Sequence, residues 1–159
     1  MKSVLFAVAA AALTVGACAP ISNTSQTILV RQLFSEQAVS GVQYPVIVRG
    51  AESVGVAPEV LAQSLRFPAG TAGNSSFRLV GPNQRPTNRA LLDIAPQGNS
   101  ATATLTFLHG ERRIGVGRFT LEREAFSNPA EVGRISSQMI LTMLRQAKGE
   151  AIQARRPQR

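Results

Sequence analysis

The chain contains very few of the side chains that transfer protons, attack substrates or bind metals. Its 159 residues include one histidine (His109), one aspartate (Asp93), one cysteine (Cys18) and no tryptophan. A tetrahedral metal site needs several His, Cys or acidic ligands, and a nucleophile needs a neighbouring base. No serine follows a strand in a sharp glycine-flanked turn. We therefore predict no catalytic residue, no metal site and no cofactor, and we do not expect an enzyme.

A single cysteine also excludes a disulfide within the chain, so an apolar core has to hold the folded part together. Long apolar runs are scarce as well. Residues 4–15 are apolar except for Thr14, they follow Lys2, and no acidic residue occurs before Glu36. A membrane-spanning helix needs about 20 apolar residues. A charged start and a shorter apolar run are instead typical of a cleaved secretion signal.

Directly after this run, Val15, Gly16, Ala17 and Cys18 resemble the lipobox of bacterial lipoproteins. The resemblance implies cleavage before Cys18, a diacylglycerol on its sulfur and a fatty acyl group such as palmitate on its nitrogen. Several acyl chains hold a protein stably on a bilayer. By the same resemblance, an aspartate directly after the cysteine would imply retention in the inner membrane. The residue there is Ala19, which implies an outer-membrane anchor facing the periplasm, with the inner membrane as the alternative. The other interpretations are ordinary signal cleavage close to Cys18, and an uncleaved helix or a buried Cys18.

Residues 1–17 contain only Lys2 as a charged side chain, so their removal takes the formal charge from +8 to +7. A basic domain attracts nucleic acid or the phosphates of lipid headgroups. The absence of tryptophan, the single tyrosine and the secretion signal argue against nucleic acid as a partner. The candidate anion-binding patch comprises Arg112 and Arg113 at a strand connection and Arg155 and Arg156 in the tail. The alternative is a solvated basic surface.

The middle of the chain has the pattern of β-strands. Residues 43–49 are rich in β-branched side chains, and residues 101–109 alternate between apolar side chains and threonine. From residue 76 onward we expect a run of antiparallel strands, with a bulge near Gly117 that reconciles two apolar phases in the last of them. Residues 27–34 are apolar enough for either a strand or a short helix.

Two helices are expected, the first over residues 58–67. The second begins after Asn128, a capping residue with Glu131 three positions later, and ends at Gly149. The predicted fold class is α+β: an antiparallel or mixed sheet of about five strands with both helices on one face. The expected organisation is a signal peptide (1–17), a flexible tether (18–27), a single α+β domain (28–149) and a basic C-terminal tail (150–159).

These features predict a lipid-anchored envelope protein that is a non-catalytic accessory or scaffold in an assembly or transport complex. Its expected partners are the membrane, through the covalent lipid, and an envelope protein that docks on an edge strand. The alternative is a lipoprotein that binds a small molecule or a glycan in an apolar pocket enclosed by the sheet and the two helices.

Overall fold

The computed structural model describes residues 25–31, 33–39, 43–70 and 75–154. The predictions for Val15, Gly16, Ala17 and Cys18, and those for Arg155 and Arg156, lie outside these residues. In chain order, the elements are β1 (Gln26–Val30), α1 (Glu36–Val39), β2 (Gln43–Arg49), η1 (Ala51–Val54), α2 (Pro58–Ser64), β3 (Ser76–Leu79), β4 (Asn88–Gln97), β5 (Ser100–His109), β6 (Arg112–Glu122), η2 (Arg123–Ser127) and α3 (Pro129–Ala154).

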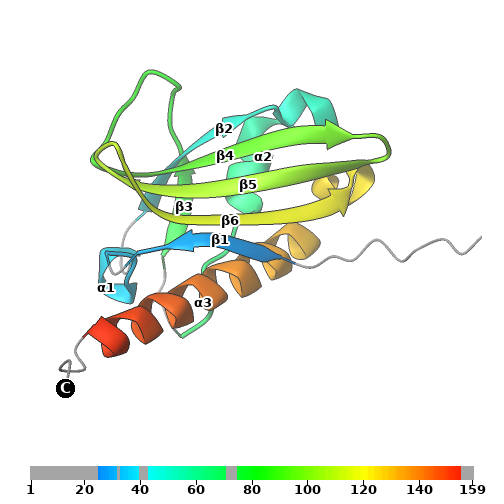
Figure 1. Cartoon of the computed structure of the whole chain (residues 1–159). Coiled ribbons are helices and arrows are strands. Elements are labelled where there is room, and N and C mark those ends of the chain that lie inside the picture. The colour runs from blue at the N-terminus through cyan, green and yellow to red at the C-terminus, as the bar shows by residue number, and fades with distance from the viewer. Residues whose placement is uncertain (1–24, 32, 40–42, 71–74, 155–159) are drawn as a thin grey trace, which may run out of the picture.

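The strands form one mixed sheet, which confirms the α+β class. Its order is β1-β6-β5-β4-β2-β3, so the described residues form six strands, against the predicted number of about five. Within residues 27–34, whose apolar pattern allows either a strand or a short helix, residues 27–30 belong to strand β1, which pairs antiparallel with β6. Figure 1 shows α3 running along the sheet next to β1 and β6, with α2 on the same side.

The expectation of antiparallel strands from residue 76 onward is wrong for β3. Strand β3 pairs with β2, and β2 pairs with β4, and both pairings are parallel. Helix α2 lies in the connection from β2 to β3, and a crossover of this kind is what parallel strands require. Only β4, β5 and β6 form the antiparallel meander. As a result, the connection between β3 and β4, residues 80–87, has to cross β2.

The helix-covered face of the sheet carries the core. Buried side chains from every strand meet apolar side chains of α2 and α3, among them Leu61, Ile135, Met139, Ile140 and Met143. A side chain at Gly115 or Gly117 would collide with Met143 or Met139, so these glycines allow α3 to lie close to β6.

The bulge predicted near Gly117 lies elsewhere on β6. Phe107 pairs with Gly115 and Leu108 with Arg113, so Ile114 is the extra residue in the ladder between β5 and β6. Because of this shift, Ile114 joins the core together with Phe119. The expected reconciliation of the two apolar phases therefore holds for Ile114 alone, because Val116 pairs with Thr106 and stays on the face opposite the core.

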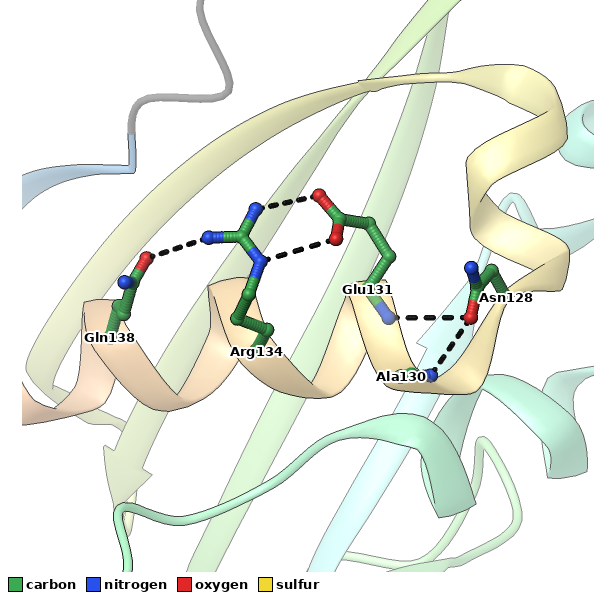
Figure 2. Close-up of polar contacts among 5 residues, drawn as sticks. All are labelled: Asn128, Ala130, Glu131, Arg134 and Gln138. Carbon is green, nitrogen blue, oxygen red and sulfur yellow. Dashed lines mark hydrogen bonds and ion pairs between the residues drawn. The ribbon is translucent and has the colours of Figure 1, made fainter.

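The start of α3 agrees with its predicted cap (Figure 2). The Asn128 side-chain oxygen accepts hydrogen bonds from the backbone N–H groups of Ala130 and Glu131, at 3.1 and 3.4 Å. Glu131 binds Arg134, whose hydrogen bonds lower the pKa of the Glu131 carboxyl. The predicted stop at Gly149 is wrong, because α3 continues to Ala154.

Candidate functional site

The face of the sheet opposite the helices carries a mixture of charged and apolar side chains. Strand register places Arg49 beside Asp93, Asp93 beside Thr104, and Thr104 beside Arg118 in one row across the sheet. A neighbouring row runs through Ile47, Leu91, Thr106 and Val116. Since side chains alternate along a strand, both rows point away from the core that contains Val46 and Leu92.

A cleft of about 330 Å³ opens on this face. Its walls come from β2, β4, β5, β6 and the connection between β3 and β4, which overhangs the sheet here. The lining residues are Ile47, Arg49, Pro82, Gln84, Arg85, Arg89, Leu91, Asp93, Thr106, Leu108, Glu111 and Arg113. Apolar side chains thus contribute to the lining, together with four arginines and two acidic side chains.

Arg89 is the buried member of this set, with 4% of its surface exposed. Its guanidinium donates hydrogen bonds to the backbone oxygens of Pro86 and Gly110, at 3.2 and 2.9 Å. It also donates to a carboxylate oxygen of Glu111 at 3.1 Å. These contacts join the connection between β3 and β4 to the turn between β5 and β6. Arg89 therefore holds one wall of the cleft in place.

The other three arginines of the cleft are held loosely. Arg49 lies 3.9 Å from the Asp93 carboxylate, and Arg85 lies 3.9 Å from that of Glu111; both arginine side chains are more than half exposed. Arg113 is exposed, and its side chain has no hydrogen bond or ion pair with the residues that the structure describes. Exposed pairs at this distance contribute little energy, so these guanidinium groups retain donors for a ligand.

A second accessible feature is the free edge of β1. This strand pairs only with β6, and no other described strand lies on its outer side. A groove lined by residues 27–31 and by Gln146 of α3 follows this edge. Ile28 and Leu33 are about half exposed, which is high for large apolar side chains. The combination leaves an apolar strand edge exposed to solvent.

The structure separates the two neighbouring arginines of the candidate patch. Arg113 lies in the cleft, whereas Arg112, opposite His109 at the end of β5, does not line it. No cluster of basic residues marks Arg49, Arg85 or Arg89 in the sequence, because each of them lacks a neighbouring arginine or lysine.

The few groups with catalytic potential do not come together. His109 is exposed at a strand end, as expected, and its Nδ1 forms a hydrogen bond with Asn88. Asp93 lies opposite Thr104, five residues from His109 along β5, or about 17 Å at 3.4 Å per residue. Among the residues that the structure describes, no three His, Cys, Asp or Glu side chains are grouped so that they could hold a metal ion.

Comparison with known proteins gives no counterpart, since no family model, no curated protein and no solved structure matches this chain. Within the described ranges, no helix is both long enough and apolar enough to cross a membrane.

Proposed function

We propose that this chain is a lipid-anchored protein of the bacterial cell envelope, held by acylated Cys18 in the outer membrane and facing the periplasm. The folded domain is a non-catalytic docking module, accessory to an assembly or transport complex. The lipobox-like residues at 15–18 and the short apolar run before them support the anchor.

The anchor is tested by the Cys18→Ser substitution in the full chain. We expect the variant to lose incorporation of a labelled fatty acid and to move from the membrane fraction to the soluble fraction, because no acylated sulfur remains. Ser22→Ala, a change just beyond the lipobox, is the matched control and keeps both properties. Normal acylation and membrane recovery of Cys18→Ser would refute the anchor.

The observation that carries the docking role is the free edge of β1. An unpaired strand edge offers N–H and C=O groups to another extended chain, and partner strands often add to such edges. The exposed Ile28 side chain provides apolar contact next to this backbone, and the groove beside Gln146 adds mainly polar surface. The proposed occupant is therefore an extended segment of an envelope protein that pairs with β1 and places an apolar side chain against Ile28.

A photo-crosslinking side chain at position 28 of the full chain, introduced in living cells, tests this role. The matched control is position 60 on α2, because Val60 is also an exposed apolar residue, at 41% against 50% for Ile28. We expect an adduct from position 28 alone, with the partner peptide identified by mass spectrometry. That peptide, made synthetically, then slows hydrogen exchange of the β1 amides.

Two results would contradict strand addition at β1. One is an equal adduct pattern from positions 28 and 60, which indicates nonspecific contact. The other is a peptide that binds but leaves the β1 amides exchanging at their original rate. Neither result affects the anchor, which the Cys18 variant tests separately.

The second candidate function is binding of a small molecule or a glycan. It was expected in an apolar pocket between the sheet and the helices, but that space is filled by buried side chains such as Phe107, Leu105 and Met139. The cleft on the opposite face is the observation that favours a small ligand, and its chemistry is polar and basic rather than apolar.

A further inference from the structure

We propose that the cleft on the helix-free face binds a phosphate monoester group. This site is independent of the β1 edge, since no residue of that edge lines the cleft. The site is assigned from the four arginines, their pairing with the two acids, and the apolar side chains beside them.

The charge of the cleft matches a doubly charged anion. Four arginines and the two acids Asp93 and Glu111 leave a net charge of +2 in the lining. A phosphate monoester carries a charge of about −1.5 to −2 at pH 7, because its second pKa is about 6. A ligand with a single carboxylate would neutralise only half of this net charge of +2. Arginine stays protonated at any physiological pH, so the four guanidinium groups keep their charge whatever the protonation of the ligand.

The arrangement of the arginines also suits a tetrahedral anion. Arg49, Arg85 and Arg113 come from β2, from the overhanging connection and from β6, and all three line the cleft. Each guanidinium can donate two parallel hydrogen bonds to phosphate oxygens. Their donors are available, because the ion pairs of Arg49 and Arg85 with carboxylates are 3.9 Å long and Arg113 has no such pair in the described part of the chain.

Buried contacts hold the walls of the cleft in place, so the cleft does not consist of exposed charged side chains alone. Buried Arg89 fixes the overhanging connection to the turn at Gly110 and Glu111. Ile47 and Leu108 are buried beneath the charged side chains, although they belong to the face away from the core. Leu91, which is half-buried and lines the same cleft, offers apolar surface for the carbon part of a phosphate ester. At about 330 Å³ the cleft is at the lower end of the range for small-ligand sites.

Calorimetric titration of the full chain, reconstituted in phosphatidylcholine vesicles, tests the site with inorganic phosphate and glycerol phosphate as probes. The decisive pair of variants is Arg113→Gln and Arg112→Gln, because both are exposed neighbours in the sequence and only Arg113 lines the cleft. We expect Arg113→Gln to weaken phosphate binding about tenfold, equivalent to about 1.4 kcal/mol, and Arg112→Gln to leave it nearly unchanged. Arg49→Gln is expected to act like Arg113→Gln.

Two sources of the phosphate are separated by adding phosphatidic acid to the vesicles. If the lipid headgroup is the natural ligand, it occupies the cleft and weakens the binding of added phosphate in the unmodified chain. Unchanged binding identifies a soluble phosphate ester as the ligand. The proposal is overturned if the unmodified chain binds no phosphate at millimolar concentration. It is also overturned if Arg112→Gln and Arg113→Gln weaken binding equally, which indicates a diffuse attraction to the basic surface.

Discussion

Tyr44 is the only tyrosine of the chain. The pKa of its phenol is expected to show whether water reaches the core around it. Its side chain is 1% exposed and contacts the rings of Phe67, Phe77 and Phe107, with centroid distances of 5.4 to 6.2 Å. Burial raises the pKa of Tyr44 from its ordinary value of 10 to about 12. The cause is the cost of placing a phenolate where water cannot reach it.

The free energy of unfolding depends on pH because the folded and unfolded chains lose the phenol proton of Tyr44 at different pH values. Between pH 10 and pH 12 the unfolded chain has lost the proton of Tyr44, whereas the folded chain retains it. The free energy of unfolding therefore falls as the pH rises through this interval, and this contribution is fully present below pH 10. Each pKa unit corresponds to 1.36 kcal/mol, so the loss amounts to about 2 to 3 kcal/mol.

The assay is denaturant unfolding at several pH values between 9 and 12, together with tyrosinate absorbance. The chain has no tryptophan, so this absorbance comes from Tyr44 alone. Tyr44→Phe keeps the ring and every other titrating group, and we expect its stability to fall by about 2 kcal/mol less over the interval. A tyrosinate signal with a midpoint near pH 10 in chains that are still folded would refute the burial argument.

Three further substitutions test the packing. Phe107→Ala removes a fully buried ring at the centre of the aromatic cluster and should lower the free energy of unfolding by about 3 to 5 kcal/mol in urea titrations. Gly50 and Gly55 both have positive φ, at 74° and 68°, but only at Gly50 would a Cβ collide with a backbone oxygen, that of Ile94. Gly50→Ala should therefore lower the melting temperature clearly more than Gly55→Ala. Equal effects would contradict the close approach of Gly50 to the Ile94 backbone. Asn128→Ala removes the cap of α3 and should cost about 1 kcal/mol, measured by chemical unfolding, with no change in partner capture.

Features that depend on a few neighbouring residues could be predicted from the sequence. The start of α3 is an example, since Asn128, Pro129 and Glu131 lie within one helical turn, and the hydrogen bonds of Asn128 follow from that spacing. The end of the same helix was mispredicted. Gly149 is exposed, and a Cβ there would meet nothing within 4 Å, so no contact forces the chain to leave the helix at this point. A glycine inside a helix costs only about 1 kcal/mol.

The order of the strands could not be predicted, because it depends on pairings between distant residues. The bounds of β2 were predicted correctly at residues 43–49, but nothing in its apolar pattern indicates that it lies between β3 and β4. The partner of Val46 in β4 is Ala90, which is more than 40 residues away. A strand pattern reports which side chains are buried, and it does not identify the neighbouring strand.

The candidate site depends on the same long-range pairings. Arg113 could be singled out because Arg112 and Arg113 form a visible cluster, whereas Arg49 and Arg89 each stand among unrelated residues. These side chains meet only because β2 pairs with β4, and because the connection between β3 and β4 crosses the sheet. The one local signal was an arginine inside the apolar strand β4, since a charged residue that is buried needs partners.

The proposed anchor limits where a partner or ligand can reach the domain. Gln26, the first residue of β1, is eight residues after Cys18, and an extended chain covers at most about 3.6 Å per residue. The docking edge therefore begins within about 29 Å of the acylated sulfur, so a strand that pairs with β1 has to be presented close to the bilayer surface. The arginine cleft lies on a face of the sheet, whereas β1 forms one of its edges, so a phosphate group in the cleft leaves β1 free. The two proposed sites are therefore expected to be occupied independently, so a phosphate ligand should leave crosslinking at position 28 unchanged.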